Sequence, residues 1–169
     1  MYGTYETIDG KAAVRFERRY PHSVDRVWRA VTEPEELGHW FPAAVEVDLS
    51  EGGAMRFTFP GGEMEPTDGR VIALDPPRRF AFRWGEEELR IELEPDGEGC
   101  RLRFTHLIST SEQAARDAAG WHVCLDRLAA ELGGDAGEAP GTEATSEWRE
   151  HYEEYQRRGV PAGAEIPGG

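Results

Sequence analysis

Hydrophobic and polar residues alternate along much of the chain. This period of two is typical of β-strands with one buried face. It predicts strands over residues 12–20, 45–49, 55–59, 67–74, 80–84, 89–93 and 102–108. Turn-forming residues such as Gly52-Gly53 and Gly61-Gly62 separate neighbouring strands. Since no helical pattern interrupts the last six strands, they are expected to form an antiparallel meander.

Two short helices are predicted between the first strand and the meander. The second begins near Thr32, which has capping-box spacing to Glu35, and ends at Gly38. The first follows Ser23, a residue that commonly caps a helix N-terminus. Its apolar residues recur at i, i+3, i+4 and i+7, and they are Val24, Val27, Trp28 and Val31.

A helix of roughly 20 residues is predicted after the last strand. Ser109 and Glu112 have capping-box spacing at its start, and Gly133-Gly134 ends it. His122 lies beside the apolar face and is expected to be exposed. The apolar sheet face needs a covering layer, so the sheet is expected to curl around this helix. A gap between the two layers would suit a small apolar molecule. The apolar face of the helix consists of Trp121, Cys124, Leu125, Leu128 and Leu132.

The C-terminal part of the chain divides into three predicted segments. Residues 133–141 are a Gly/Ala-rich linker, residues 142–158 an additional helix, and residues 159–169 a disordered tail rich in Pro and Gly. An aromatic stripe on the helix could pack on the domain, cap the entrance of a pocket, or form a homodimer contact. The stripe consists of Trp148, Tyr152 and Tyr155.

Composition and charge restrict the function classes. The 169 residues suit one domain, here residues 12–132, and a net charge of −14 argues against nucleic-acid partners. A mean hydropathy of −0.64 and the lack of a long apolar run argue against membrane insertion. With no secretory signal pattern at the start and only Cys100 and Cys124, the expected location is a reducing cytoplasm.

His106 is the polar residue with the most informative position. Strand parity places it on the inward face with Leu102 and Phe104. It could serve as an acid/base group or ligand donor, or be a structural histidine with satisfied hydrogen bonds. The pair Glu63 and Glu65 is either a solvated loop face or a pair of carboxylates that reach a pocket.

Other chemical motifs are lacking in the sequence. The run Glu86-Glu87-Glu88 is expected to face solvent. No phosphate-binding or dinucleotide-binding glycine motif, nucleophile elbow or closely spaced histidine pair occurs, so neither a cofactor nor a metal site is predicted.

Large aromatic residues on the inward faces are the candidates for a ligand cavity. Trp40-Phe41-Pro42, after the second short helix, could form a lid at the cavity mouth or a plug in the core. The remaining aromatic positions could equally line a pocket or fill the space between sheet and helix. The predicted cavity residues are Trp40, Phe41, Phe57, Phe59, Phe82, Trp84, His106, Trp121 and Leu125.

Residues 12–132 resemble a known family. The order of strand, two short helices, meander and long helix resembles the α+β helix-grip fold of START/Bet v 1-like proteins, the SRPBCC superfamily. Local motifs are similar to the branch named after the activator of Hsp90 ATPase, AHSA1-like. These motifs are residues 27–37 with Trp40-Phe41, Glu51-Gly52-Gly53, Asp75-Pro76-Pro77-Arg78-Arg79-Phe80, residues 102–106 and Gly120-Trp121.

The resemblance implies three alternative functions. The chain could bind a small hydrophobic molecule in an internal cavity. It could be an enzyme of the cyclase or aromatase type, with His106 as the catalytic candidate. It could also be a co-chaperone that stimulates the Hsp90 ATPase. The resemblance does not extend to residues 142–169, so it implies nothing about them.

Overall fold

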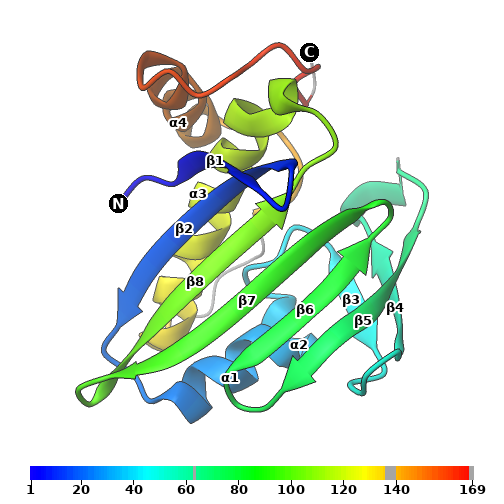
Figure 1. The fold of residues 1–169 in the computed structure, drawn as a ribbon, viewed down its shortest axis with the longest axis vertical. Helices are drawn as coiled ribbons and strands as arrows, with labels where there is room; N and C mark the ends of the chain where they lie inside the picture. The colour runs from blue at the N-terminus through cyan, green and yellow to red at the C-terminus, as the bar shows by residue number, and fades with distance from the viewer. Residues whose placement is uncertain (63, 136–139, 168–169) are drawn as a thin grey trace.

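In the part of the chain that the structure describes, eight antiparallel strands form one open sheet in the order β1-β2-β8-β7-β6-β5-β4-β3 (Figure 1). The computed structural model describes residues 1–62, 64–135 and 140–167. The strands are β1 (Thr4–Ile8), β2 (Lys11–Tyr20), β3 (Ala44–Val47), β4 (Ala54–Thr58), β5 (Thr67–Asp75), β6 (Arg79–Trp84), β7 (Glu87–Asp96) and β8 (Gly99–Leu107).

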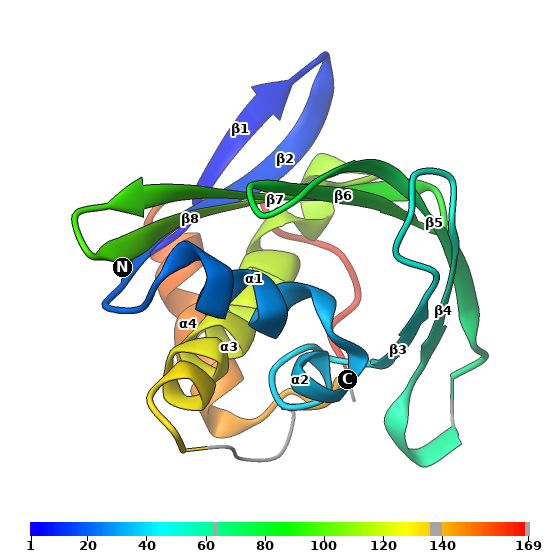
Figure 2. The same ribbon diagram turned by 90° about the horizontal axis from the view of Figure 1, so that it is seen from below.

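The helices lie under the concave face of this sheet (Figure 2). Two short 3₁₀ turns, η1 (Pro60–Gly62) and η2 (Ser111–Gln113), follow β4 and β8. The predicted α+β helix-grip architecture is confirmed. Among the described residues, no helix is long and apolar enough to cross a membrane. The helices are α1 (Val24–Thr32), α2 (Pro34–Leu37), α3 (Ala114–Leu132) and α4 (Ser146–Arg157).

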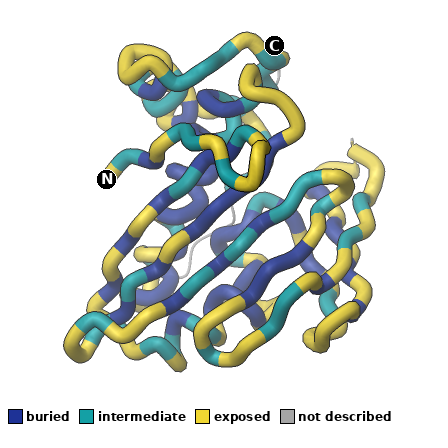
Figure 3. The backbone as a smooth tube through the Cα atoms, in the orientation of Figure 1, coloured by how far each residue is buried: buried dark blue, intermediate teal, exposed yellow. Residues whose placement is uncertain are grey.

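The residues that the alternating pattern predicts to face inward are buried in strands β4 and β7 of the meander. In β7 the side chains of Leu89, Ile91 and Leu93 are buried beneath the sheet. In β4 the side chains of Met55 and Phe57 are buried in the same way, and the residues between and beside them are exposed. Figure 3 shows this alternation of buried and less buried positions along the strands. Burial of one face in the core between the sheet and the helices therefore fixes the register of the meander.

Strand β1 is an addition to the predicted set. It pairs with β2, and Ile8 lies opposite Lys11 across a two-residue turn. Asp9 and Gly10 form that turn with φ angles of 52° and 77°. Positive φ at both positions is the geometry of a type I′ hairpin, for which Asp-Gly is a favoured sequence.

The helix starts agree with the sequence in part. Ser23 caps α1, and its hydroxyl accepts a hydrogen bond from the Arg26 amide at 3.2 Å. The capping box before α3 is one residue later than predicted, because Thr110 pairs with Gln113. The predicted cap at Thr32 is wrong. Its hydroxyl donates to the Trp28 carbonyl at 2.6 Å, and α2 begins at Pro34 without a side-chain cap.

The C-terminal segment is built into the fold. Helix α4 packs along α3, and Trp148 and Tyr155 are buried within the chain itself, which is the self-packing alternative for the aromatic stripe. A contact with a second copy could therefore use only Tyr152 of the three without unpacking α4. Four residues of the predicted linker, 136–139, lie outside the described residues.

The segment after α4 also contacts α3. The amide of Ala115 donates to the carbonyl of Pro161 at 2.9 Å. Arg116 donates from Nη1 to the carbonyl of Glu165 at 3.3 Å. The structure thus places residues 160–167 against the start of α3, in place of the disordered tail that their composition predicts.

His122 is buried, and its predicted exposure is wrong. Only 4% of its surface is accessible. Tyr2 from the start of the chain and Tyr155 and His151 from α4 surround its ring, with centroids 4.8, 5.9 and 3.9 Å away. The pattern of α3 alone could not reveal this, because the covering residues come from both ends of the chain.

Candidate functional site

A cavity of about 1120 Å³ lies where the sheet, α3 and the C-terminal segment meet. The sheet side contributes apolar and polar groups, among them Thr67 and Glu87. Helix α3 contributes Gly120 and Cys124, and α4 contributes Trp148. The space is sufficient for a small organic molecule, since ligand pockets commonly measure about 300–1,000 Å³.

Four of the predicted cavity residues line this space, namely Phe59, Trp84, His106 and Trp121. Their rings form a continuous aromatic wall. The Trp84 ring stacks on Phe59 at a centroid distance of 5.9 Å and meets Trp121 edge-on at 6.2 Å. His106 lies at 5.8 Å from Trp121, perpendicular to it.

The other five predicted residues belong to the core behind this wall. Each is almost completely buried, and none lines the cavity. Their rings or side chains fill the space between sheet and helix, which was the alternative left open by the sequence. These five are Trp40, Phe41, Phe57, Phe82 and Leu125.

Trp40 is a core residue and not a lid. Its ring has no accessible surface, and its indole N–H donates to the carbonyl of Ala30 at 2.9 Å. Phe41 is buried beside it, with the two ring centroids 5.7 Å apart. Of the three residues Trp40-Phe41-Pro42, Pro42 alone reaches the cavity.

A hydrogen-bonded chain of three side chains forms the polar side of the cavity. The indole N–H of Trp121 donates to Nδ1 of His106 at 2.9 Å. Nε2 of His106 lies 2.6 Å from a carboxylate oxygen of Glu87. Because an indole nitrogen can only donate, Nδ1 is the acceptor and Nε2 carries the proton toward Glu87. Both ring nitrogens are therefore engaged, as expected of a structural histidine with satisfied hydrogen bonds.

Glu87 is anchored by donors from three directions. Besides His106, its carboxylate accepts hydrogen bonds from the hydroxyl of Ser109 at 2.9 Å and the side-chain amide of Gln113 at 3.0 Å. Burial acts to raise the pKa of Glu87, but these hydrogen bonds outweigh it and lower the pKa to about 2. A carboxylate at this site thus stays ionised at neutral pH.

The low pKa of Glu87 predicts a specific loss of stability in acid. The pKa falls from 4.5 to about 2 on folding, so ionised Glu87 stabilises the fold above pH 4.5. This contribution is about 2 kcal/mol after allowance for partial exposure. It is lost as the pH falls from 4.5 to about 2. Urea unfolding measures the free energy of unfolding at pH 7 and pH 3. The decrease between the two pH values should be smaller in Glu87→Gln than in the wild type.

The matched control is Glu65→Gln, because Glu65 is exposed and has none of the hydrogen bonds given for Glu87. Its free energy of unfolding should decrease between pH 7 and pH 3 by as much as that of the wild type. If the free energy of unfolding of Glu87→Gln decreased between pH 7 and pH 3 by as much as that of the wild type, ionised Glu87 would not stabilise the fold.

Glu87 is a site residue that the sequence interpretation missed. The run Glu86-Glu87-Glu88 was expected to face solvent, yet Glu87 lines the cavity. Strand parity could have found it, since Glu87 is two residues before the inward-facing Leu89, which lies opposite His106. Of the loop carboxylates, Glu65 is exposed and Glu63 lies outside the described residues.

Among the described residues, two clusters of side chains have the composition of metal ligands, although the sequence predicts no metal site. Glu87, His106 and Asp117 offer ligand atoms within 4.8 Å of one another at the cavity wall. An ion there would have to displace the bond between His106 and Glu87. The second cluster, His122, Asp126 and His151, lies away from the cavity and joins α3 to α4.

Solved structures with the same fold cover most of the chain. The crystal structure of CalU16 from Micromonospora echinospora has 27% sequence identity and a TM-score of 0.71, covering 92% of this chain and 94% of that one. A conserved protein of unknown function from Enterococcus faecalis, EF2215, has 22% identity and a TM-score of 0.73, over 92% and 89% of the two chains. At that identity the similarity shows the fold alone.

DynU16, described as a protein in the dynemicin biosynthetic locus, has 27% identity and a TM-score of 0.66. The alignment covers 75% of this chain but 49% of DynU16, so this chain spans about half of that protein.

Comparison with curated proteins gives no match. The family described as "Activator of Hsp90 ATPase homolog 1-like protein" matches residues 21–133, from the turn before α1 to the end of α3. That range holds the sheet from β3 to β8 and the helix that it grips. The chain therefore belongs to the family of activator of Hsp90 ATPase homolog 1-like proteins.

Proposed function

We propose that this chain binds a small, largely apolar molecule in the cavity between the sheet, α3 and the C-terminal segment. The observation that carries the proposal is the cavity of about 1120 Å³ with Trp84, Trp121 and Trp148 in its wall. Flat aromatic surfaces favour a ligand with rings or conjugated segments, because such a ligand can stack on them.

The polar side of the cavity would orient this ligand. Glu87 and Gln113 sit on the same wall as His106, and Arg116 and Arg149 also line the cavity. A few fixed polar groups within an apolar wall are the usual source of ligand orientation and specificity. The preferred ligand should therefore combine an apolar body with a hydrogen-bonding group at one end.

The comparisons support this class of ligand. DynU16 is described by its place in a biosynthetic locus, and loci of that kind produce small organic molecules. Fold alone does not decide between holding such a molecule and transforming it. The cavity and its lining are therefore the basis of the proposal, and DynU16 adds the context of a biosynthetic locus.

An enzyme of the cyclase or aromatase type is the second candidate. The pair His106 and Glu87, 2.6 Å apart at the cavity wall, is the observation that favours it. Catalysis by His106 would require its bond to Glu87 or to Trp121 to open when substrate binds. A His106→Gln variant that still binds ligand but forms no product would support this candidate. Co-chaperone activity toward Hsp90 is a third proposal, carried by the family description alone.

A cavity-filling variant tests the proposed function. Thr67→Phe places a ring in the cavity from β5, whereas Thr58→Phe places the same ring at an exposed position of β4 outside the cavity. Native mass spectrometry with a panel of fatty acids and aromatic polyketides would measure complexes with the wild type and both variants. Thr67→Phe should weaken binding more than about tenfold, which corresponds to a loss of about 1.4 kcal/mol.

The control variant should bind like the wild type. Two results would contradict the proposal: no complex with any member of the panel, or equal binding by Thr67→Phe and Thr58→Phe. Circular dichroism of both variants checks that each retains the fold.

A further inference from the structure

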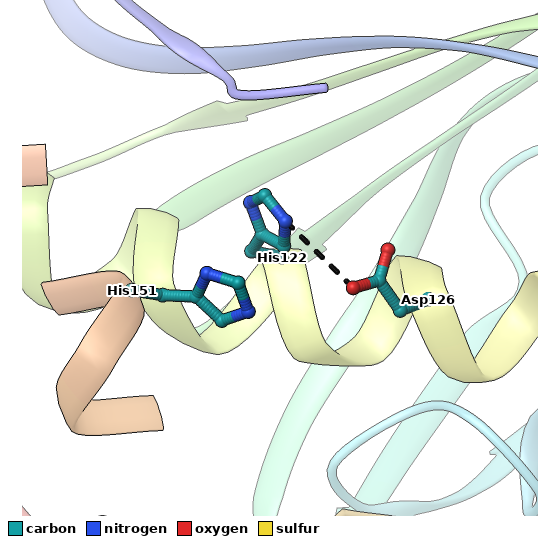
Figure 4. Close-up of side chains that lie close together, drawn as sticks. All are labelled: His122, Asp126 and His151. Carbon is teal, nitrogen blue, oxygen red and sulfur yellow. Dashed lines mark ion pairs between the residues drawn. The ribbon is translucent and has the colours of Figure 1, made fainter. Parts of the chain in front are cut away.

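The second cluster of ligating side chains lies where α4 crosses α3. Figure 4 shows His122 and Asp126 one turn apart on α3, with His151 of α4 facing them. None of the three lines the cavity. We infer that His122, Asp126 and His151 form a binding site for one divalent transition-metal ion of the zinc type, separate from the ligand cavity.

The three side chains converge closely enough to share an ion. One ligand atom from each lies within 4.8 Å of the others. Nε2 of His122 is 3.7 Å from an Asp126 carboxylate oxygen. A tetrahedral zinc ion bound at about 2.1 Å holds its ligand atoms roughly 3.4 Å apart. The two residues on α3 therefore need little movement to bind an ion together.

His151 makes the larger adjustment. Its ring is stacked on His122 with centroids 3.9 Å apart and an interplanar angle of 25°. One nitrogen of each histidine must point at the ion, so the His151 ring has to rotate out of this stack. Its side chain is only partly buried at the edge of α4, which leaves room for that rotation.

The surroundings of His122 resemble the second layer of a metal site. Nδ1 of His122 lies 2.9 Å from the Tyr155 hydroxyl, whose oxygen also accepts the amide of Gly3 at 2.8 Å. When Nδ1–H donates to this oxygen, the free electron pair of the ring is on Nε2, on the side of Asp126. Metal-binding histidines commonly have such a partner on the other nitrogen, because it fixes the tautomer and the ring orientation.

Asp126 is held in the same way. One of its oxygens accepts a hydrogen bond from Nη1 of Arg18 at 2.7 Å, and the other faces His122. The positive charge of Arg18, and that of the N-terminus near His122, oppose a cation and should reduce the affinity. With one carboxylate and two imidazoles against these charges, we expect a moderate site and not a tight structural one.

The donor set selects the metal. Two imidazoles and one carboxylate suit zinc, cobalt, nickel and copper, whereas calcium and magnesium prefer oxygen ligands alone. Ligation requires both imidazoles in the neutral form. An ion bound here would also link α3 to α4 and stabilise the C-terminal segment.

Zinc titration of the full chain tests this inference. Tag-free protein, stripped with a chelator and exchanged into buffer, is titrated with zinc chloride by calorimetry at pH 7, and cobalt absorption reports the coordination geometry. We expect one ion per chain. His151→Ala and Asp126→Asn should each weaken binding more than about tenfold. Zinc should raise the melting temperature of the wild type, and should do so much less in either variant.

The controls separate this site from other sources of zinc binding. His22→Ala removes a histidine from the turn before α1, far from the cluster in sequence, and should bind like the wild type. Glu87→Gln removes a ligand from the cluster at the cavity wall and should also bind like the wild type. Melting curves with chelator present show whether each variant is folded.

Three results would overturn the inference. They are the absence of zinc binding by the wild type, unchanged binding in folded His151→Ala or Asp126→Asn, and loss of binding in Glu87→Gln but not in His151→Ala. Each of these outcomes leaves the proposed function of the cavity unaffected, because the two sites share no residue.

Discussion

Replacing Tyr155 with alanine is expected to lower the free energy of unfolding by about 3–5 kcal/mol, as for other large aromatic residues removed from a core. Tyr155 has no accessible surface and contacts the rings of Tyr2 and Phe16. Its hydroxyl also accepts the amide of Gly3. A loss of this size is a large part of the stability of a typical domain, about 5–15 kcal/mol.

The effect can be divided by two further variants. Tyr155→Phe keeps the ring and loses only the hydroxyl, at an expected cost of about 1–2 kcal/mol. Tyr152→Ala, on the same helix but half-buried, should cost less than either. Urea unfolding at pH 7 measures all three. Helix α4 lies outside the residues that the family matches. If Tyr155→Ala were at least as stable as Tyr152→Ala, the packing of α4 would not contribute to the stability of the fold.

Replacing Trp40 with alanine is expected to have a similarly large effect on stability. The side chain is fully buried, and its removal leaves a cavity beside Phe41 and a carbonyl of Ala30 without its donor. Both losses destabilise the fold, by about 3–5 kcal/mol together. Trp40→Phe, which keeps part of the ring volume, should lose less. Urea unfolding at neutral pH gives the comparison.

Ligand binding by the Trp40 variants distinguishes a core residue from a lid. Because Trp40 does not line the cavity, folded Trp40→Phe should bind ligand with wild-type affinity. A lid residue would give the opposite result, with a small change in stability and a large loss of affinity. That second pattern would show that Trp40 belongs to the binding site.

The regular elements could be predicted because their signals are local. Period-two alternation predicted the strands of the meander, since one face of each contributes side chains to the buried core. Strand β1 escaped prediction because its residues alternate weakly, although Asp9-Gly10 is a strong hairpin signal. In the same way, the capping box of α3 was placed one residue early because Ser109, Thr110, Glu112 and Gln113 offer two overlapping candidate pairs.

The candidate site was less predictable because its residues depend on contacts between distant segments. His106 was placed inward by parity, but its bonds to Trp121 and Glu87 join β8, α3 and β7. The sequence could not decide which aromatic residues line the cavity and which fill the core. That division depends on how closely α3 approaches each strand. The covering of His122 likewise depends on α4, for which no family resemblance was available.

The five tryptophans offer the most direct test of a ligand-binding cavity. Trp84, Trp121 and Trp148 line the cavity, whereas Trp28 and Trp40 do not. Their indole N–H signals can be followed by NMR spectroscopy while a ligand identified by mass spectrometry is titrated. The account predicts shifts for the three cavity signals and little change for the other two. Binding that shifts only Trp28 or Trp40, or leaves all five signals unchanged, would contradict it.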